Sequence, residues 1–278
     1  MIINMKMKTS TKIILYSLVV LFMLLLMFPF VWMMLTSFKT PAEIMQIPPG
    51  LLPDNFTFDN YRTVFERQPF LRFIINSLVI SITSCLLSIL ITSMAGYGFS
   101  KFYFKGKEVM FFLILCFLIV PFQSIVVPLY SWIVRFGLID TYLGISLPLL
   151  VSAFGVFLMR QGMDTVPNEI IEAARIDGCH EFHLFLTIVM PITKPFIATQ
   201  AIIKFMWSWN EFFWPLVITN REEMKVVTVG LQSFTNMYFV VHNLISAAAV
   251  LSVLPMAVMF IFFQRGIVRA IAMSGIKG

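Results

Sequence analysis

The sequence predicts an all-α polytopic membrane protein with six transmembrane helices. Of its 278 residues, 59% are hydrophobic and 12% are charged, whereas a soluble domain is about half apolar and roughly a quarter charged. The mean hydropathy of +0.89 excludes a soluble globular protein and a disordered one. Six stretches reach the ~20 apolar residues that a helix needs to cross a bilayer.

The predicted spans cover 13–35, 71–95, 109–130, 142–160, 196–218 and 244–264. Three lysines precede the first span, as in a signal peptide, but its apolar run is longer than a signal h-region and no small-residue cleavage site follows. We therefore expect it to remain as a span. No tandem repeat is present, so we expect an N-terminus at 1–12, one six-span domain at 13–264 and a tail at 265–278.

The orientation follows from the distribution of basic residues around the spans. Twelve Lys and Arg lie in the two termini and the loops 96–108 and 160–195. On the other side there are seven, offset by seven acids: six lie in 36–70, 131–141 and 219–243, and Arg72 lies at the start of the second span. Cytoplasmic segments carry the excess of positive charge. Both termini are therefore expected to be cytoplasmic. This flanking placement also explains the net charge of +6 without a nucleic-acid partner.

The 160–195 loop is much longer than an ordinary connection between two spans. Pro167 suits the first position of a helix, Glu169 suits its first turn and Gly178 suits its end. Glu172 and Arg175, three residues apart, are expected to be neighbours on this helix. A second short helix is expected from about 181 to 189, ending before Pro191. Such helices suit either a groove on a cytoplasmic partner or the membrane surface.

The segment 172–191 resembles a specific motif. Glu172-Ala173-Ala174 is followed by Gly178 and, after nine intervening residues, by Ile188-Val189-Met190-Pro191. This pattern resembles the EAA motif of permease subunits of ABC importers, with Met190 where Leu is commonest, a mild exchange. The segments 95–107, 152–161, 209–215 and 264–278 are also similar to the carbohydrate branch of that family, the maltose-type second permease. The chain is thus identified as a member of the binding-protein-dependent transport inner-membrane component family.

The resemblance implies a bacterial inner-membrane (plasma-membrane) permease whose EAA loop forms a coupling helix on an ATPase subunit. The implied partners are a second, homologous permease, two copies of an ATP-binding subunit and an extracytoplasmic solute-binding protein. ATP and Mg would bind to the ATPase subunits, and this chain would bind no cofactor. The loops 36–70 and 219–243 are the candidates for receiving the binding protein. The implied coupling residues are Glu172, Ala173, Ala174, Asp177, Gly178 and Pro191.

The fifth predicted span contains charged residues, which are costly inside a membrane and often functional. At 3.6 residues per turn, one stripe contains Gln200, Lys204, Trp207, Ser208, Glu211 and Pro215. The charges of Lys204 and Glu211 lie about two turns, or roughly 10 Å, apart, so we do not expect them to neutralise each other.

This stripe could line a hydrophilic substrate path or join the helix to its neighbours. We take Lys204, Trp207, Asn210 and Glu211 as candidate path residues. Weaker candidates are Gln123, Ser124 and Tyr130, which lie near Pro121 and Pro128, because a proline can kink a span and open a cavity.

The sequence contains no motif for catalysis by the chain itself. Gly106-Lys107 lacks the other residues of a P-loop, and His180 and His183 have no third ligand for a metal site. We therefore expect no enzyme, no catalytic residue and no metal. The predicted function is import of a carbohydrate, an oligosaccharide or glycoside. Alternatives are a permease for a peptide or amino acid, or a secondary transporter driven by an ion gradient.

Overall fold

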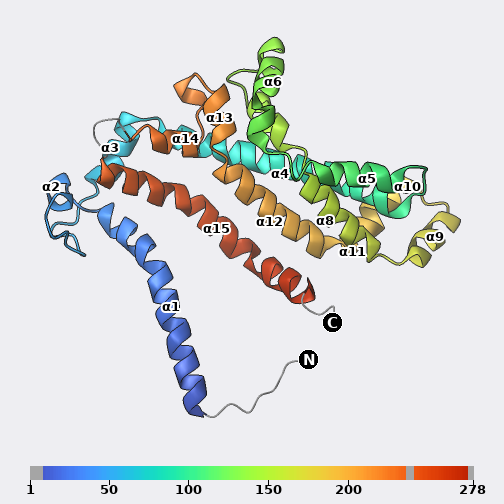
Figure 1. Ribbon diagram of the computed structural model, residues 1–278, viewed down its shortest axis with the longest axis horizontal. Coiled ribbons are helices and arrows are strands. Elements are labelled where there is room, and N and C mark those ends of the chain that lie inside the picture. The colour runs from blue at the N-terminus through green and yellow to red at the C-terminus, as the bar shows by residue number, and fades with distance from the viewer. Residues whose placement is uncertain (1–8, 236–240, 275–278) are drawn as a thin grey trace. The chain divides into compact units, whose positions relative to one another are not determined.

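A computed structural model describes the backbone of residues 9–235 and 241–274 and the side chains of residues 10–235 and 241–261. The described chain is helical, with no extended strand (Figure 1). It divides into two compact units, residues 1–68 with 233–253 and residues 69–232 with 254–278. The expected N-terminal segment 1–12 and tail 265–278 lie largely outside the residues whose side chains are described.

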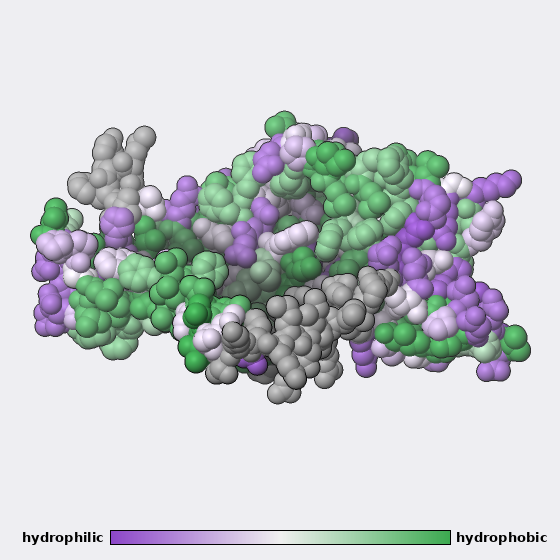
Figure 2. All heavy atoms as spheres, turned by 60° about the horizontal axis from the view of Figure 1, so that its bottom comes forward, coloured by the Kyte–Doolittle hydropathy of each residue, from purple (hydrophilic) through white to green (hydrophobic). Residues whose placement is uncertain are grey.

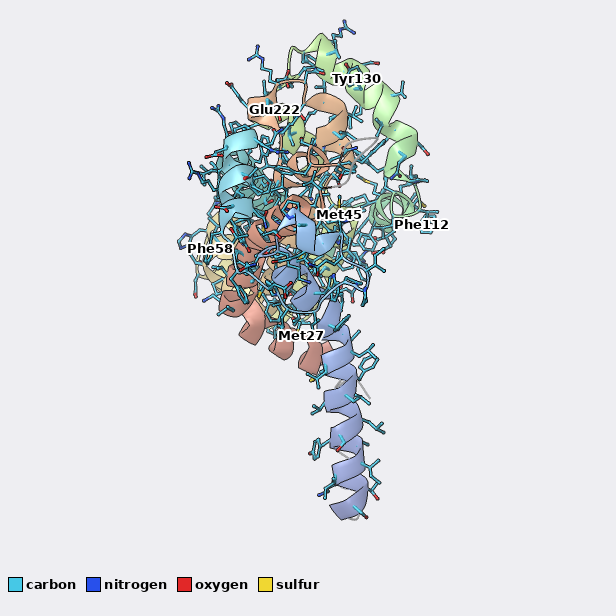
Figure 3. All side chains as sticks on the ribbon, turned by 90° about the vertical axis from the view of Figure 1, so that its left-hand side faces the viewer. Met27, Met45, Phe58, Phe112, Tyr130 and Glu222 are labelled. Atoms are coloured by element: carbon cyan, nitrogen blue, oxygen red, sulfur yellow. The ribbon has the colours of Figure 1, made fainter. Side chains whose placement is uncertain are left out.

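The first unit contains three helices and the beginning of the last one. They are α1 (Thr9–Thr36), α2 (Pro41–Ile44), α3 (Asp59–Arg67) and the start of α15 (His242–Ser274). Side chains stand out from α1 in every direction around Met27 (Figure 3), and none of its apolar window is buried. The 36–70 segment is ordered by Asn60, whose amide donates hydrogen bonds of 2.8 Å to the carbonyls of Ser37 and Lys39.

The second unit is built on α4 (Phe70–Lys101), which lies beside α8 (Ala153–Asp164) and α12 (Lys194–Asn210) (Figure 1). The close approach of α4 and α8 requires Gly96. A Cβ at that position would lie 2.8 Å from the backbone of Met159 and Arg160. The remaining elements of this unit are α5 (Lys107–Cys116), α6 (Phe122–Arg135), α7 (Tyr142–Ser146), η1 (Leu147–Leu149), α9 (Asn168–Ile176), α10 (Glu181–Leu184), η2 (Phe185–Val189), α11 (Met190–Ile192), α13 (Phe213–Ile218), η3 (Glu222–Met224) and α14 (Val227–Gln232).

Three described helices are long and apolar enough to cross a membrane, namely 10–36, 70–101 and 242–261. Two bent pairs also qualify if each pair is one span, at 142–164 with a bend of 53° and at 181–210 with a bend of 82°. These elements correspond to five of the six predicted spans, although the second bent pair, at 181–210, begins and ends earlier in the chain than the predicted span 196–218.

The third predicted span, 109–130, is two helices rather than one. α5 ends at Cys116 and α6 begins at Phe122. Pro121 immediately precedes α6 in an extended conformation, with φ −63° and ψ 132°. Since proline disfavours helical geometry in the residue before it, the sequence stops one helix and starts another here.

Candidate functional site

The short helix predicted after Pro167 is α9, Asn168–Ile176. Pro167 lies just before the helix rather than at its first position, and Glu169 occupies the first turn as predicted. The helix ends at Ile176, and Gly178, two residues later, adopts φ +78°. Glycine reaches this left-handed conformation without the steric cost that a Cβ brings. The EAA segment therefore ends in a sharp turn.

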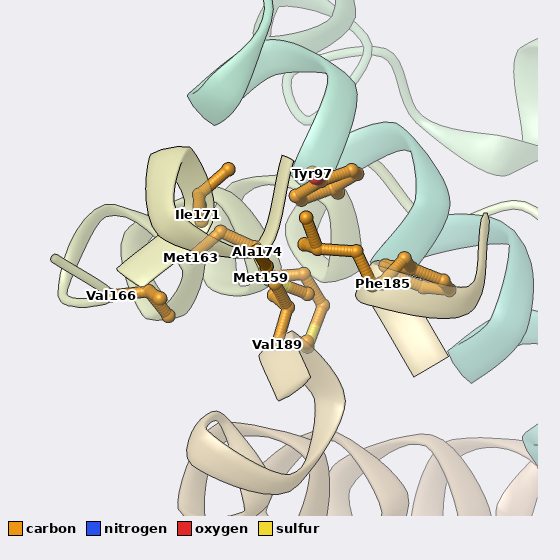
Figure 4. Packing of buried hydrophobic residues seen from close by; sticks show 9 residues of the cluster. Tyr97, Met159, Met163, Val166, Ile171, Ala174, Phe185 and Val189 are labelled. Atoms are coloured by element: carbon orange, nitrogen blue, oxygen red, sulfur yellow. The ribbon is translucent and has the colours of Figure 1, made fainter. Parts of the chain in front are cut away.

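One face of α9 packs inward. Ile171 and Ala174 are 2% and 8% exposed and join a cluster that also contains Met159, Met163 and Val189. Figure 4 shows this cluster between α9 and the ends of the neighbouring helices. The burial fixes the rotation of α9 about its axis, because two residues three positions apart must both face the cluster.

The opposite face of α9 is open to solvent within this chain. Glu172 and Ala173 are exposed, and Ile176 is 85% exposed. The two alanines of the motif thus have different environments, since Ala174 packs internally and Ala173 lies on the surface. In Figure 2 hydrophilic residues gather at the right-hand end of the molecule, where α9 and α10 lie. An exposed isoleucine beside acidic residues gives this end a small apolar contact point.

The second short helix differs from its prediction. α10 continues through a π-helical turn, η2, and then α11, so helical backbone passes Pro191 and ends at Ile192. Pro191 is the second residue of α11, which directly follows the π-helical turn. His180 caps α10 by accepting a hydrogen bond from the Phe182 backbone N–H at 3.3 Å. The described residues contain no group of three or more metal-ligating side chains.

Arg175 pairs with Glu181 rather than with Glu172. Its Nε donates to Glu181 Oε1, and the other oxygen of that carboxylate accepts a 2.9 Å hydrogen bond from the Tyr97 hydroxyl. Helical spacing predicted only that Glu172 and Arg175 are neighbours on α9, and both do lie on it three residues apart. The pairing with Glu181 arises because the turn at Gly178 brings α10 back beside α9. Spacing within one helix contains no information about this neighbour.

Two further polar contacts hold the start of α9. Lys101 Nζ, at the end of α4, donates to the Val166 carbonyl at 2.6 Å and to Asn168 Oδ1 at 2.9 Å.

A separate ion pair joins α8 and α5. Arg160 donates to Glu108 Oε1 at 2.6 Å, and this hydrogen bond holds the pKa of the Glu108 carboxyl below its usual range. Glu108 is solvent-exposed, so the pair contributes little to stability.

The predicted polar stripe of the fifth span divides between two environments. Gln200, Lys204 and Ser208 are buried, at 3%, 6% and 6% exposure, and the Gln200 amide donates to Thr92 Oγ1 of α4. Trp207 is 55% exposed, with its ring centroid 5.8 Å from that of Phe154. Asn210 is exposed and donates to the Met206 carbonyl at 2.9 Å. Lys204 is therefore an interior residue of this unit, whereas Trp207 and Asn210 are surface residues.

Glu211 marks a break in the predicted span 196–218. α12 ends at Asn210, Glu211 is extended, and α13 begins at Phe213. Glu211 Oε1 accepts a 3.2 Å hydrogen bond from the Trp214 backbone N–H, and its carbonyl accepts one of 2.7 Å from Thr228. The carboxylate thus satisfies a free donor at the start of α13.

Gln123, Ser124 and Tyr130 are all exposed along α6, and Figure 3 shows Tyr130 on that helix. The structure does not bring them together with Trp207 or Asn210 by any described hydrogen bond or ring contact. Sequence reasoning also missed a row of buried hydroxyls on α4. Ser81, Ser84 and Ser88 are each 0% exposed. Their spacing of three or four residues marks one helix face and was available as a signal.

Comparison with known proteins decides the family. Residues 88–273 match the model of the "Binding-protein-dependent transport system inner membrane component" family. The chain belongs to this family. Its members are transport components of ABC importers rather than catalysts. The α9 motif thus lies in an inner-membrane component of a binding-protein-dependent importer.

Relatives match this inner-membrane component over most of its length. The arabinooligosaccharide transport permease AraQ of Halalkalibacterium halodurans is 35% identical over 90% of this chain and 91% of its own. The lactose transport permease LacG of Rhizobium radiobacter is 31% identical over 92% and 93%. A crystal structure of a bacterial ABC transporter that imports the acidic polysaccharide alginate contains a chain with the same fold. The TM-score is 0.81 at 22% identity, covering 93% of this chain and 98% of that one.

Proposed function

We propose that this inner-membrane component is a permease subunit that imports an oligosaccharide or glycoside using ATP hydrolysed by separate subunits. The observation that carries this proposal is the end-to-end similarity, at 35% identity, to a permease named for arabinooligosaccharides. Substrate class also follows from the similarity to a lactose permease. A relative named for sn-glycerol-3-phosphate, 30% identical, makes a small phosphorylated solute the alternative to test.

The proposed topology has six spans with both termini in the cytoplasm of a bacterium. The basic flanks place the α9–α10 segment on the same side as the termini. The third span would be formed by α5 and α6 together, and one domain would extend over 13–264. On the other side, 36–70 and 219–243 would receive the solute-binding protein, on which the family depends by name.

The proposed docking face of α9 consists of Glu172, Ala173, Ile176 and Asp177, all exposed. Glu172 and Asp177 supply charge, Ile176 supplies an apolar contact, and Ala173 leaves room for close approach. Ala174, Gly178 and Pro191 act instead through the shape of the segment. An ATPase subunit would bind this face and carry the ATP and Mg. A second permease would bind a second ATPase.

The test is a purification of the tagged chain in mild detergent from cells that express the complete importer. We expect a P-loop ATPase and a second six-span permease to co-elute. Glu172→Lys should remove the ATPase while the second permease remains, because it reverses one charge on the docking face. The matched control is Glu223→Lys, which reverses the charge of another exposed glutamate, in η3, and should retain both.

The substrate is tested with the complex in proteoliposomes together with its binding protein. Arabino-oligosaccharide, lactose, sn-glycerol-3-phosphate and a tripeptide are supplied in turn, and ATP hydrolysis and uptake are measured. Stimulation by a saccharide alone supports the proposal, whereas stimulation by sn-glycerol-3-phosphate or the tripeptide alone rejects the substrate class. A tagged chain that elutes with no ATPase, and transport that follows an ion gradient, would reject the ABC mechanism.

A further inference from the structure

Glu181 connects two helices through the two oxygens of one carboxylate. Oε1 accepts from Arg175 Nε on α9, and Oε2 accepts from the Tyr97 hydroxyl on α4 at 2.9 Å. A carboxylate bound on both oxygens by a cation and a hydroxyl is held more strongly than by neutral hydrogen bonds. The three side chains therefore form a continuous polar link between α9 and α4, which we call the Tyr97–Glu181–Arg175 link.

Aromatic packing fixes the Tyr97 end of this link. Tyr97 is 5% exposed, and its ring centroid lies 5.5 Å from that of Phe102 and 5.4 Å from that of Phe185. The Arg175 guanidinium lies 5.8 Å from the Phe102 ring centre. The phenol ring thus has little freedom to turn, so its hydroxyl is held in one position beside Glu181, whose side chain is 38% exposed.

Tyr97 lies at the point where α4 is in close contact with α8. Tyr97 follows Gly96, the residue that allows α4 to touch α8, and α4 also packs along α12. A displacement of α9 that moves Tyr97 therefore also moves α4, the helix against which α8 and α12 pack. The Lys101 contacts hold only the beginning of α9, whereas Arg175 lies in its last turn. Both ends of α9 are consequently connected to α4.

We propose that the Tyr97–Glu181–Arg175 link transmits movement of α9 to α4, with Tyr97 and Glu181 as positioning residues that couple ATP hydrolysis to transport. This inference rests on the proposed function, in which α9 receives an ATPase subunit. None of the three residues needs to touch ATP or the solute. A purely structural link would instead serve assembly, and its loss would lower the yield of the complex without changing the transport obtained per ATP.

The test compares Tyr97→Phe and Glu181→Gln with the wild type in the complete importer, reconstituted with its binding protein. Tyr97→Phe keeps the packed ring and removes only the hydroxyl. Glu181→Gln keeps the size and removes the charge that holds Arg175. The matched control is Thr187→Val. Its hydroxyl donates to the His183 carbonyl one turn earlier in the same continuous helical segment, at 2.7 Å, and no described hydrogen bond connects it to α4 or α9.

We expect each link variant to assemble at wild-type yield and to hydrolyse ATP, but to transport about tenfold less solute per ATP. The double variant should be no worse than either single variant, because each breaks the same link. Thr187→Val should keep the wild-type ratio.

Three results would overturn the inference. These are an unchanged ratio in both link variants, a loss that is additive in the double variant, and failure of Tyr97→Phe to assemble, which would make the role structural. A wild-type chain that elutes without an ATPase would reject the proposed function itself, and this outcome is visible before any variant is compared.

Discussion

Lys101, the last residue of α4, donates a 2.9 Å hydrogen bond to Asn168, the first residue of α9. The same ammonium also donates to the Val166 carbonyl at 2.6 Å. Sixty-seven positions separate the two side chains in sequence. One lysine therefore sets where the exposed helix of the EAA segment begins, relative to the longest packed helix of its unit.

Replacing Lys101 by Met should loosen this attachment. Loss of two charge-assisted hydrogen bonds should raise the open population of the segment, and with it the cleavage rate at Glu169 or Glu172, by about tenfold. The measurement is digestion of membrane vesicles with a glutamate-specific protease. Lys105→Met removes the same charge from an exposed position nearby. The protease should cleave this variant at the wild-type rate. Equal rates in the two variants would show that Lys101 does not hold α9.

Gly96→Ala should destabilise the contact between α4 and α8, because the new methyl would lie 2.8 Å from helix backbone. Overpacking of this kind costs about 1–3 kcal/mol. Gly98→Ala is the control, since nothing lies within 4 Å of its Cβ position, and it should be neutral or stabilising by up to about 1 kcal/mol. The stability of both variants is measured by thermal unfolding in detergent. A Gly96 variant as stable as the Gly98 variant would contradict the close approach.

The lowered pKa of Glu108 predicts that the stability of the fold depends weakly on pH. The hydrogen bond from Arg160 lowers the pKa of the Glu108 carboxyl. A carboxyl with a lowered pKa in the folded state stabilises the fold above its unfolded pKa, and this contribution disappears as the pH falls through the folded value. The difference in unfolding temperature between wild type and Glu108→Gln should therefore be small at pH 7 and vanish in acid. A difference that grows on acidification would have the wrong sign.

Trp207→Ala should impair transport without impairing assembly. Trp207 lies on the surface of α12, where its indole face can pack against a sugar ring, and loss of an aromatic contact of this kind should weaken transport about tenfold. Trp132→Ala is closely matched, since Trp132 is 65% exposed and its ring centroid lies 5.7 Å from that of Phe136. The measurement is the rate of solute uptake by the two variants at limiting solute concentration. An equal loss in both variants would remove Trp207 from the substrate path.

The limits of sequence reasoning are visible at particular residues. Glu169 and Gly178 bound α9 because helix ends depend on local chemistry. The partner of Arg175 could not be found in this way, since it depends on how the chain folds back after Gly178. The sequence did not predict the end of a helix at Glu211, because apolar residues continue on both sides of it. Lys204 and Trp207 were placed on one stripe, since periodicity alone does not show which side of an apolar helix meets α4.

The exposure of α1 has a consequence for how the gene can vary. Among the described residues, none of the apolar window of α1 is buried, so we expect little demand from internal shape complementarity on which aliphatic or aromatic side chain stands at a given position there. Length and hydropathy are the properties that must be retained. Random mutagenesis should therefore recover many functional exchanges among Leu, Ile, Phe and Met within 13–31, and few at Gly96 or along the buried serines of α4. Inherited substitutions should accumulate in the same uneven way.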